Sequence, residues 1–192
     1  MQHLRDEELM CAYQKGDMLA MEEILRRYKN PLFRFAQRLC RNKEEAEDIA
    51  QEVFLRVHQF RLRYIPSGKF STWIFSIAHN LFLENFRKQK WLVLWPRKAN
   101  DPDEPVEFAS PTLSAAEECE RQDLAEKVKR CIQGLPFLQK EALILREYEQ
   151  MSYEEIAVVL NKSQGTVKTL IHRALENLQN RLLSLAEEIK GG

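Results

Sequence analysis

Glycine, proline and long apolar stretches are all scarce in this sequence. It contains 6 glycines and 7 prolines among 192 residues. Sandwiches and barrels of β-strands need many turn residues, so a helical protein is the first expectation. No stretch approaches the roughly 18 consecutive apolar residues of a membrane span. The charged start MQHLRDEELMCAYQKGD also lacks the apolar run of a signal peptide. These absences predict a cytoplasmic protein with no direct membrane insertion.

Motifs of metal sites and enzymes are missing as well. The four cysteines include no CxxC pair, and the four histidines include no HxxxH or HExxH pair. The sequence has no phosphate-binding, dinucleotide-binding or nucleophile-elbow motif. We expect the cysteines to be small buried apolar residues, because neither zinc-site spacing nor a cytosolic disulfide framework is indicated. The sequence therefore favours a protein that is not an enzyme and that uses no metal or other cofactor.

The net charge is zero, but the charges are segregated along the chain. There are 29 basic and 29 acidic residues, which at first argues against a nucleic-acid partner. Residues 54–90, however, contain seven basic residues and one acid, whereas residues 101–126 contain nine acids and one basic residue. The basic segment is typical of a surface that faces nucleic acid.

Helical patterns occupy two stretches separated by a linker. Apolar residues recur at helical spacing from about residue 6 to residue 89, and Asn30-Pro31 predicts a boundary between two helices within them. The pattern stops over residues 95–115, where four prolines and four acids indicate an extended linker. It resumes at Ala116. We expect an all-α fold in which a small N-terminal helical bundle and a small C-terminal helix-turn-helix domain are joined by a flexible acidic linker.

The C-terminal stretch contains the most specific local pattern. Ser152 and Glu155 form a capping box for a short helix that ends near Leu160, and Ser163 is placed to cap a second helix from Gln164. A short helix, a tight turn and a second helix predict helix-turn-helix geometry. One side of the second helix is apolar, with Val167, Ile171, Ala174 and Leu178. The opposite side is polar and contains no acid, with Lys168, Thr169, His172 and Arg173. Such a side-chain set suits a helix that lies in the major groove of DNA. An ordinary helical hairpin with a mixed polar face is the alternative.

Aromatic and basic residues are interleaved around a Pro/Gly loop in the N-terminal stretch. This mixture favours a surface on which unpaired bases stack, with phosphate contacts beside it. In the helix expected from Ser71, the buried stripe should comprise Ile74, Ile77, Ala78 and Leu81. A second stripe comprises Trp73, Ser76, Asn80 and Arg87. We expect a pocket that captures a flipped base, formed by Tyr64, Lys69, Phe70, Trp73 and Asn80. A basic amphipathic helix without this role is the alternative.

Three segments in a fixed order resemble bacterial RNA polymerase sigma factors of the sigma-70 family, in its extracytoplasmic-function (ECF) subfamily. They are RNKEEAEDIAQEVFLRVHQF at 41–60, GKFSTWIFSIAHNLFLENFRKQK at 68–90 and MSYEEIAVVLNKSQGTVKTLIHRALENL at 151–178. Phe86 departs from the aliphatic residue frequent in the family but remains apolar. The resemblance implies a region 2-like domain over 1–93, an acidic Pro-rich linker over 94–115 and a region 4-like domain over 116–192.

The resemblance also implies partners and the residues that contact them. Core RNA polymerase would be bound through the clamp of its largest subunit and the flap of its second subunit, and an anti-sigma factor would hold the two domains closed. The residues implied to bind core polymerase are Asp48, Ile49, Gln51, Glu52 and Leu55. Those implied to open and read the −10 element as a single strand are Arg61, Arg63, Tyr64, Lys69, Phe70, Ser71, Trp73, Asn80, Arg87 and Lys88. Those implied to read the −35 element as duplex are Ser163, Gln164, Gly165, Thr166, Lys168, Thr169, His172 and Arg173.

Two other classes of protein compete with a sigma factor. A stand-alone helix-turn-helix regulator would pair one such domain with a ligand-binding domain and would bind its operator without polymerase. A helical enzyme would need converging acids, bases or metal ligands, and the sequence indicates none. A sigma factor accounts for single-strand chemistry in the first domain, duplex reading in the second and the linker between them.

Overall fold

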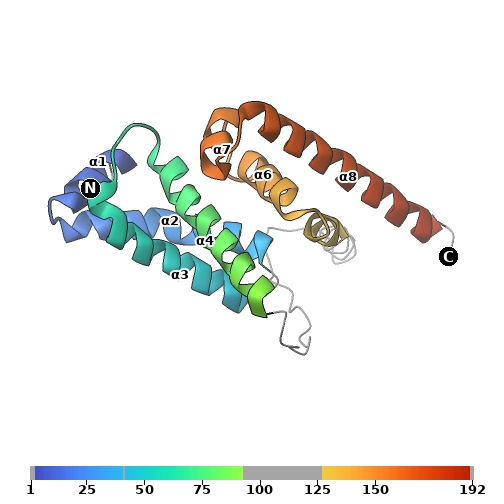
Figure 1. The fold of residues 1–192 in the computed structure, drawn as a ribbon, viewed down its shortest axis with the longest axis horizontal. Coiled ribbons are helices and arrows are strands. Elements are labelled where there is room, and N and C mark those ends of the chain that lie inside the picture. The colour runs from blue at the N-terminus through green and yellow to red at the C-terminus, as the bar shows by residue number, and fades with distance from the viewer. Residues whose placement is uncertain (1–2, 41, 93–126, 191–192) are drawn as a thin grey trace, which may run out of the picture.

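The computed structural model describes residues 3–40, 42–92 and 127–190, and within them it contains helices and no strand. The helices form two groups that lie side by side along the long axis of the molecule (Figure 1). This agrees with the all-α expectation. The predicted acidic linker lies outside the described residues. None of the described helices is both long and apolar enough to span a bilayer.

The N-terminal group consists of four α-helices and one short 3-10 helix. Their bounds are α1 Asp6–Gln14, α2 Met18–Leu39, α3 Lys43–Phe60, η1 Arg61–Arg63 and α4 Phe70–Leu92. Two of the helices begin at side-chain caps, which satisfy amide groups that have no partner in the first turn. The Asp17 carboxylate accepts from the amides of Leu19 and Ala20, and the Asn42 side chain accepts from that of Glu45.

The predicted helix boundary at Asn30-Pro31 is wrong, because α2 continues through it. Proline removes one hydrogen bond of the helix ladder and disfavours a helical interior. Both sides of Pro31 nevertheless contribute to one buried stripe, which includes Ile24 and Tyr28 before it and Leu32 and Phe35 after it. Packing of this continuous apolar face outweighs the local preference of proline.

The C-terminal group consists of a helical segment over 127–133 and three further helices. These are α6 Phe137–Glu147, α7 Tyr153–Leu160 and α8 Gln164–Lys190. The predicted caps are confirmed, since Ser152 and Glu155 form a capping box at the start of α7, and Ser163 Oγ accepts the amide of Thr166 at 3.1 Å. Asn161 turns the chain in the left-handed conformation, with φ of 50°. The helix-turn-helix prediction therefore agrees with α7 and α8.

The two groups share a continuous hydrophobic core. Helix α4 packs on α7, and α2 packs on α6. The predicted buried stripes are confirmed for Ile74, Ile77, Ala78 and Leu81 on α4, and for Val167, Ile171 and Ala174 on α8. Cys40 and Cys131 are buried free thiols and Cys11 is a partly buried one, whereas Cys119 lies outside the described residues. Burial raises the pKa of Cys40 to about 12.

Candidate nucleic-acid interface and partner groove

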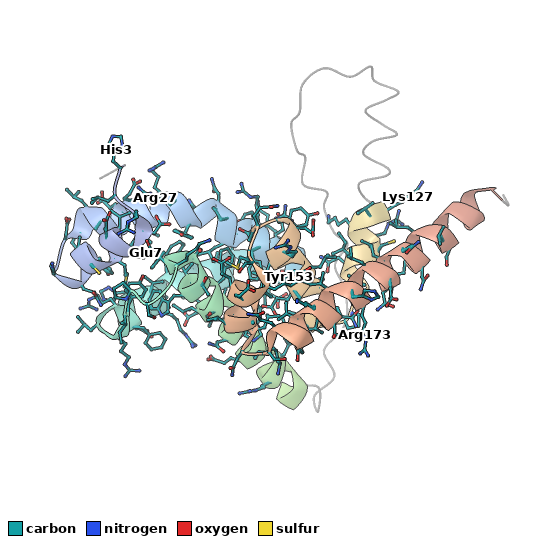
Figure 2. All side chains as sticks on the ribbon, turned by 90° about the horizontal axis from the view of Figure 1, so that it is seen from above. His3, Glu7, Arg27, Lys127, Tyr153 and Arg173 are labelled. Carbon is teal, nitrogen blue, oxygen red and sulfur yellow. The ribbon has the colours of Figure 1, made fainter. Side chains whose placement is uncertain are left out.

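The first turns of helix α8 and the turn before it present a polar surface to solvent, and the exposed Leu175 follows further along the helix. All eight residues implied to read a duplex are exposed, and Figure 2 shows Arg173 on the outer side of α8. Thr169 Oγ1 donates to the carbonyl of Gly165 at 2.9 Å, so its hydroxyl also contacts the helix backbone. The sequence pattern predicted no acid on this side of the helix. Glu176, one turn beyond His172, is an exception, since its carboxylate lies 3.2 Å from His172 Nδ1.

The residues implied to read a single strand are divided between exposed and buried positions. The exposed ones are Arg63, Lys69, Asn80 and Arg87, and the partly buried ones are Arg61, Ser71 and Trp73. Tyr64 and Phe70 are buried, and the side chain of Lys88 lies outside the described residues. The polar members whose side chains are described are therefore accessible, whereas two of the three aromatic rings of the set belong to the core.

Three of these aromatic rings form one cluster under the loop between η1 and α4. The Tyr64 ring centroid lies 4.9 Å from that of Trp73 and 5.8 Å from that of Phe70, and Phe70 lies 5.6 Å from Trp73. Burial raises the pKa of Tyr64 to about 12. The cluster brings together the aromatic part of the expected base-capture pocket, but its rings contact one another.

Lys69 connects this loop to the helix-turn-helix group. Its Nζ lies 2.7 Å from Glu155 Oε1, the carboxylate that also closes the capping box of α7. The Lys69 side chain is 72% exposed, so this ion pair contributes little free energy. Burial of Glu155 opposes its ionisation, but hydrogen bonds from Lys69 and the Ser152 amide hold its pKa below the usual carboxyl range.

The contact between the two groups also contains buried polar residues. His79 on α4 places Nδ1 2.9 Å from Glu141 Oε1 on α6, and both side chains are buried. Burial raises the pKa of Glu141, and the hydrogen bond from His79 opposes that rise. Lys140 Nζ donates to the carbonyl of Leu39 at 3.3 Å and to Gln133 Oε1 at 2.9 Å.

Aromatic side chains complete the contact around this buried polar centre. Phe137 on α6 packs on two rings of α4, at 4.5 Å from Phe86 and 5.9 Å from Phe82 between centroids. The guanidinium of Arg38 on α2 lies 3.9 Å above the ring of Tyr148. In Figure 2, Tyr153 lies where α7 meets the N-terminal helices. The two groups are therefore joined by specific contacts as well as by apolar packing.

A separate groove of about 390 Å³ lies between α3 and α4. Arg56 crosses it, donating to both carboxylate oxygens of Glu84 at 2.8 and 2.7 Å and to Glu52 at 3.2 Å. These bonds raise the pKa of Arg56, that from Glu84 most. All five residues implied to bind a polymerase line the groove, together with four others. The full lining is Asp48, Ile49, Gln51, Glu52, Leu55, Arg56, Leu81, Glu84 and Asn85.

The chemistry of the groove suits a protein partner. Leu55 is an apolar side chain at its rim that is 57% exposed, and acidic groups lie around it at Asp48, Glu52 and Glu84. An apolar contact bordered by charges is the arrangement found in protein interfaces. No cluster of His, Cys, Asp and Glu able to hold a metal ion occurs within the described parts of the chain.

The sequence did not identify three residues that bond to the expected DNA-binding elements from segments far away in the chain. Glu7 and Gln14 of α1 bond to the loop between η1 and α4, and Glu141 pairs with His79 across 62 residues. Glu7 and Gln14 fall in an ordinary amphipathic helix, and Glu141 falls in a helix of mixed composition. Their partners are set by the packing of helices, so no local spacing identifies them.

Comparison with known proteins gives consistent matches over most of the chain. The sigma-70 region 2 family matches residues 24–92, and the sigma-70 region 4 family matches residues 125–178. The RNA polymerase sigma-H factor of Pseudomonas aeruginosa is 31% identical over 96% of this chain and 97% of its own length. The ECF RNA polymerase sigma factor SigW of Bacillus subtilis is 31% identical over 89% of this chain and 93% of its own.

Solved structures share the fold. The sigma factor RpoE of Bartonella quintana, in complex with the anti-sigma factor NepR, superposes with a TM-score of 0.68 at 24% identity, covering 84% of this chain and 95% of that one. CnrH, in complex with the cytosolic domain of CnrY, superposes with a TM-score of 0.66 at 21% identity, covering 93% of this chain and 97% of that one.

Proposed function

Because this chain belongs to the extracytoplasmic-function group of the sigma-70 family of RNA polymerase sigma factors, we propose a division of work between its two helical groups. As a sigma factor it is a transcription initiation factor and not an enzyme. In the proposal, the α3/α4 groove binds the clamp of the largest polymerase subunit, and the C-terminal group contacts the flap of the second subunit. Helix α8 reads the −35 element as duplex, and α4 with the loop before it reads the −10 element as a single strand.

The observation that carries the polymerase contact is the composition of the α3/α4 groove. Five residues expected from the family resemblance to bind polymerase line one concave surface. The apolar Leu55 at the rim and the Asp48 carboxylate, beside the Arg56 ion pairs with Glu52 and Glu84, can bind a partner surface that is apolar and basic. We place this contact, and the action of the protein, in the cytoplasm with the polymerase.

Charge reversal in the groove tests this contact. We expect Asp48→Lys and Glu52→Lys to abolish holoenzyme formation, because each places a cation where the partner would supply one. Glu47→Lys is the matched control, since Glu47 is an exposed acid on the same helix that is not part of the groove lining. Affinity for core polymerase is measured with the full chain, and circular dichroism checks folding. Wild-type affinity in both groove variants would refute the contact.

The proposed DNA contacts are expected to need polymerase. The chain has no net charge, whereas strong autonomous binders make roughly six to ten phosphate contacts. The free protein should therefore bind promoter DNA weakly, and the holoenzyme should bind it well. Promoter-specific binding at nanomolar concentration by the free protein in physiological salt would favour a stand-alone regulator instead.

The packed arrangement of the two groups must open on a promoter. The −10 and −35 elements lie about 25 base pairs apart, or about 85 Å at about 3.4 Å per base pair. Helix α7 contacts both α4 and α8, so the DNA-facing surfaces of α4 and α8 are held too close together to reach both elements at once. We propose that an anti-sigma factor binds and stabilises this closed arrangement. Two solved structures with this fold contain a protein partner, NepR in one and CnrY in the other.

A further inference from the structure

The loop between η1 and α4 is bonded at both of its ends to helix α1. The side-chain nitrogen of Gln14 donates to the carbonyl oxygens of Arg61, at 2.7 Å, and of Tyr64, at 2.9 Å. At the other end, the amide of Phe70 donates to Glu7 Oε1 at 2.8 Å. One short helix therefore fixes both where the loop begins and where α4 begins.

The spacing of these contacts determines how the loop projects. Glu7 and Gln14 are separated by about two turns, or about 10 Å along the helix. The chain from Tyr64 to Phe70 could span about 20 Å if it were extended. Since its ends are bonded to points that lie closer together, the intervening residues must arch outward. All residues of the arch, 65–69, are exposed, with Ile65 reaching 74%.

Helix α1 is itself attached firmly enough to act as a support. The Asp6 carboxylate accepts from the Arg27 guanidinium at 2.6 Å and from the Tyr28 hydroxyl, and Arg27 also donates to the carbonyl of Leu4 at 2.8 Å. Figure 2 labels Arg27 and Glu7 at the same end of the molecule, where α1 lies. Sites are positioned best when their supporting residues lie on rigid elements.

We propose that Gln14 and Glu7 are positioning residues for recognition of the −10 element. They fix the position of the loop at residues 65–69, which includes Lys69, relative to the first turn of α4 before DNA binds. This inference rests on the proposed function of the loop and α4. A loop that is already ordered avoids the entropy cost of being ordered on binding. Each hydrogen bond lost should weaken −10 recognition by about two- to tenfold.

A variant of Gln14 tests the first anchor. Gln14→Met keeps the length of the side chain and removes the donor, and Gln59→Met is a matched control at an exposed position on α3. Holoenzyme is assayed on promoters with substitutions in the −10 or the −35 element. For Gln14→Met, which removes two hydrogen bonds, we expect unchanged affinity for core polymerase, open-complex formation slower by at least about fourfold and reduced discrimination among −10 sequences. Discrimination among −35 sequences should stay at the wild-type value.

Two variants of Glu7 test the second anchor independently. Glu7→Gln retains an oxygen that can accept from the Phe70 amide and should behave nearly as the wild type. Glu7→Met removes the acceptor of one hydrogen bond and should produce the same kind of defect as Gln14→Met, of about two- to tenfold. Such rescue by the conservative variant is not expected from a general loss of stability.

The outcomes separate this inference from the function on which it rests. It is overturned if Gln14→Met and Glu7→Met change nothing, or if they reduce polymerase affinity and both kinds of promoter discrimination in parallel. If Lys69→Ala and Asn80→Ala impair −10 discrimination while the α1 variants do not, only the inference fails. If none of the four variants alters −10 discrimination, the proposed reading of that element by the loop and α4 fails with it.

Discussion

The imidazole of His79 and the carboxylate of Glu141 face each other across the boundary between α4 and α6, with both side chains buried and Nδ1 2.9 Å from Oε1. These residues belong to different helical groups, and under the proposed function the DNA-facing surfaces of the two groups separate on a promoter. The pair therefore stabilises the closed arrangement, which the proposed function requires the protein to leave. Replacing His79 alone should therefore reveal how much the pair stabilises the closed arrangement.

His79→Ala should open the molecule. It leaves the buried Glu141 carboxyl group without its hydrogen-bond partner, which costs about 1–3 kcal/mol. We expect a larger radius of gyration by X-ray scattering and little loss of helix content. His172→Ala is the control, since it removes a His–Glu pair that is exposed and should cost at most about 1 kcal/mol. The double variant His79→Leu/Glu141→Leu should close again, and an unchanged radius for His79→Ala would contradict the prediction.

Acid stability should depend on Glu23. Hydrogen bonds from Arg26 and Arg27 lower its pKa to about 2. A carboxyl group whose pKa is lower in the folded state stabilises the fold above its unfolded pKa, and this stabilisation is lost as pH falls through the folded value. Glu23→Gln should therefore be less stable than wild type near neutral pH, and the difference should shrink between about pH 5 and pH 2.

Urea unfolding midpoints across this pH range measure the effect. The exposed neighbour Glu22 provides a control, and Glu22→Gln should leave the pH dependence of the midpoint unchanged. A constant difference between wild type and Glu23→Gln at all pH values would mean that the Arg26 and Arg27 bonds do not stabilise the ionised form.

Lys168→Ala and Arg173→Ala should impair recognition of the −35 element while leaving affinity for core polymerase intact. Both side chains are exposed on α8. A residue that reads a base should lose about 1–3 kcal/mol of discrimination at one position, whereas a phosphate contact should weaken binding evenly across sequences. Transcription from a set of −35 variants distinguishes these roles. Wild-type transcription from every promoter in the set, for both variants, would exclude either contact.

Asn80→Ala, combined with substitutions in the loop at 65–69, should slow open-complex formation on duplex promoters. Stacking and capture of one base yield about 1–3 kcal/mol, comparable to the cost of unpairing a nucleotide. A template already melted over the −10 region should restore most of the rate, because the unpairing cost is already met. Equal defects on duplex and melted templates would instead indicate a role in folding or docking.

Features with local causes could be predicted from the sequence, and features with distant causes could not. Ser152, Glu155 and Ser163 act within three residues of their own positions, so spacing was enough to predict the helix-turn-helix. Pro31 was misread because the packing of α2 overrides its local preference. Tyr64 and Phe70 were identified as part of a binding surface, and their burial follows from ring contacts that only the assembled bundle provides.

The groove residues on α3 illustrate the intermediate case. Asp48, Gln51, Glu52 and Leu55 share a helix face, so the sequence could place them together. The opposite wall of the groove, with Leu81 and Glu84, comes from α4 and required the fold. Gln14 and Glu7 had no signal of their own, because their bonds join residues 47 to 63 positions apart.

The hydrophobic core that runs from the N-terminal helices into α7 and α8 has a consequence for how the protein can evolve. Under the proposed function, the same contacts that stabilise the free chain have to be broken before transcription can start. A substitution that tightens the packing of α4 on α7 would raise the melting temperature and slow initiation together. Selection on this surface is therefore expected to favour moderate stability, and the most heat-resistant variants should be among the weakest activators of their promoters.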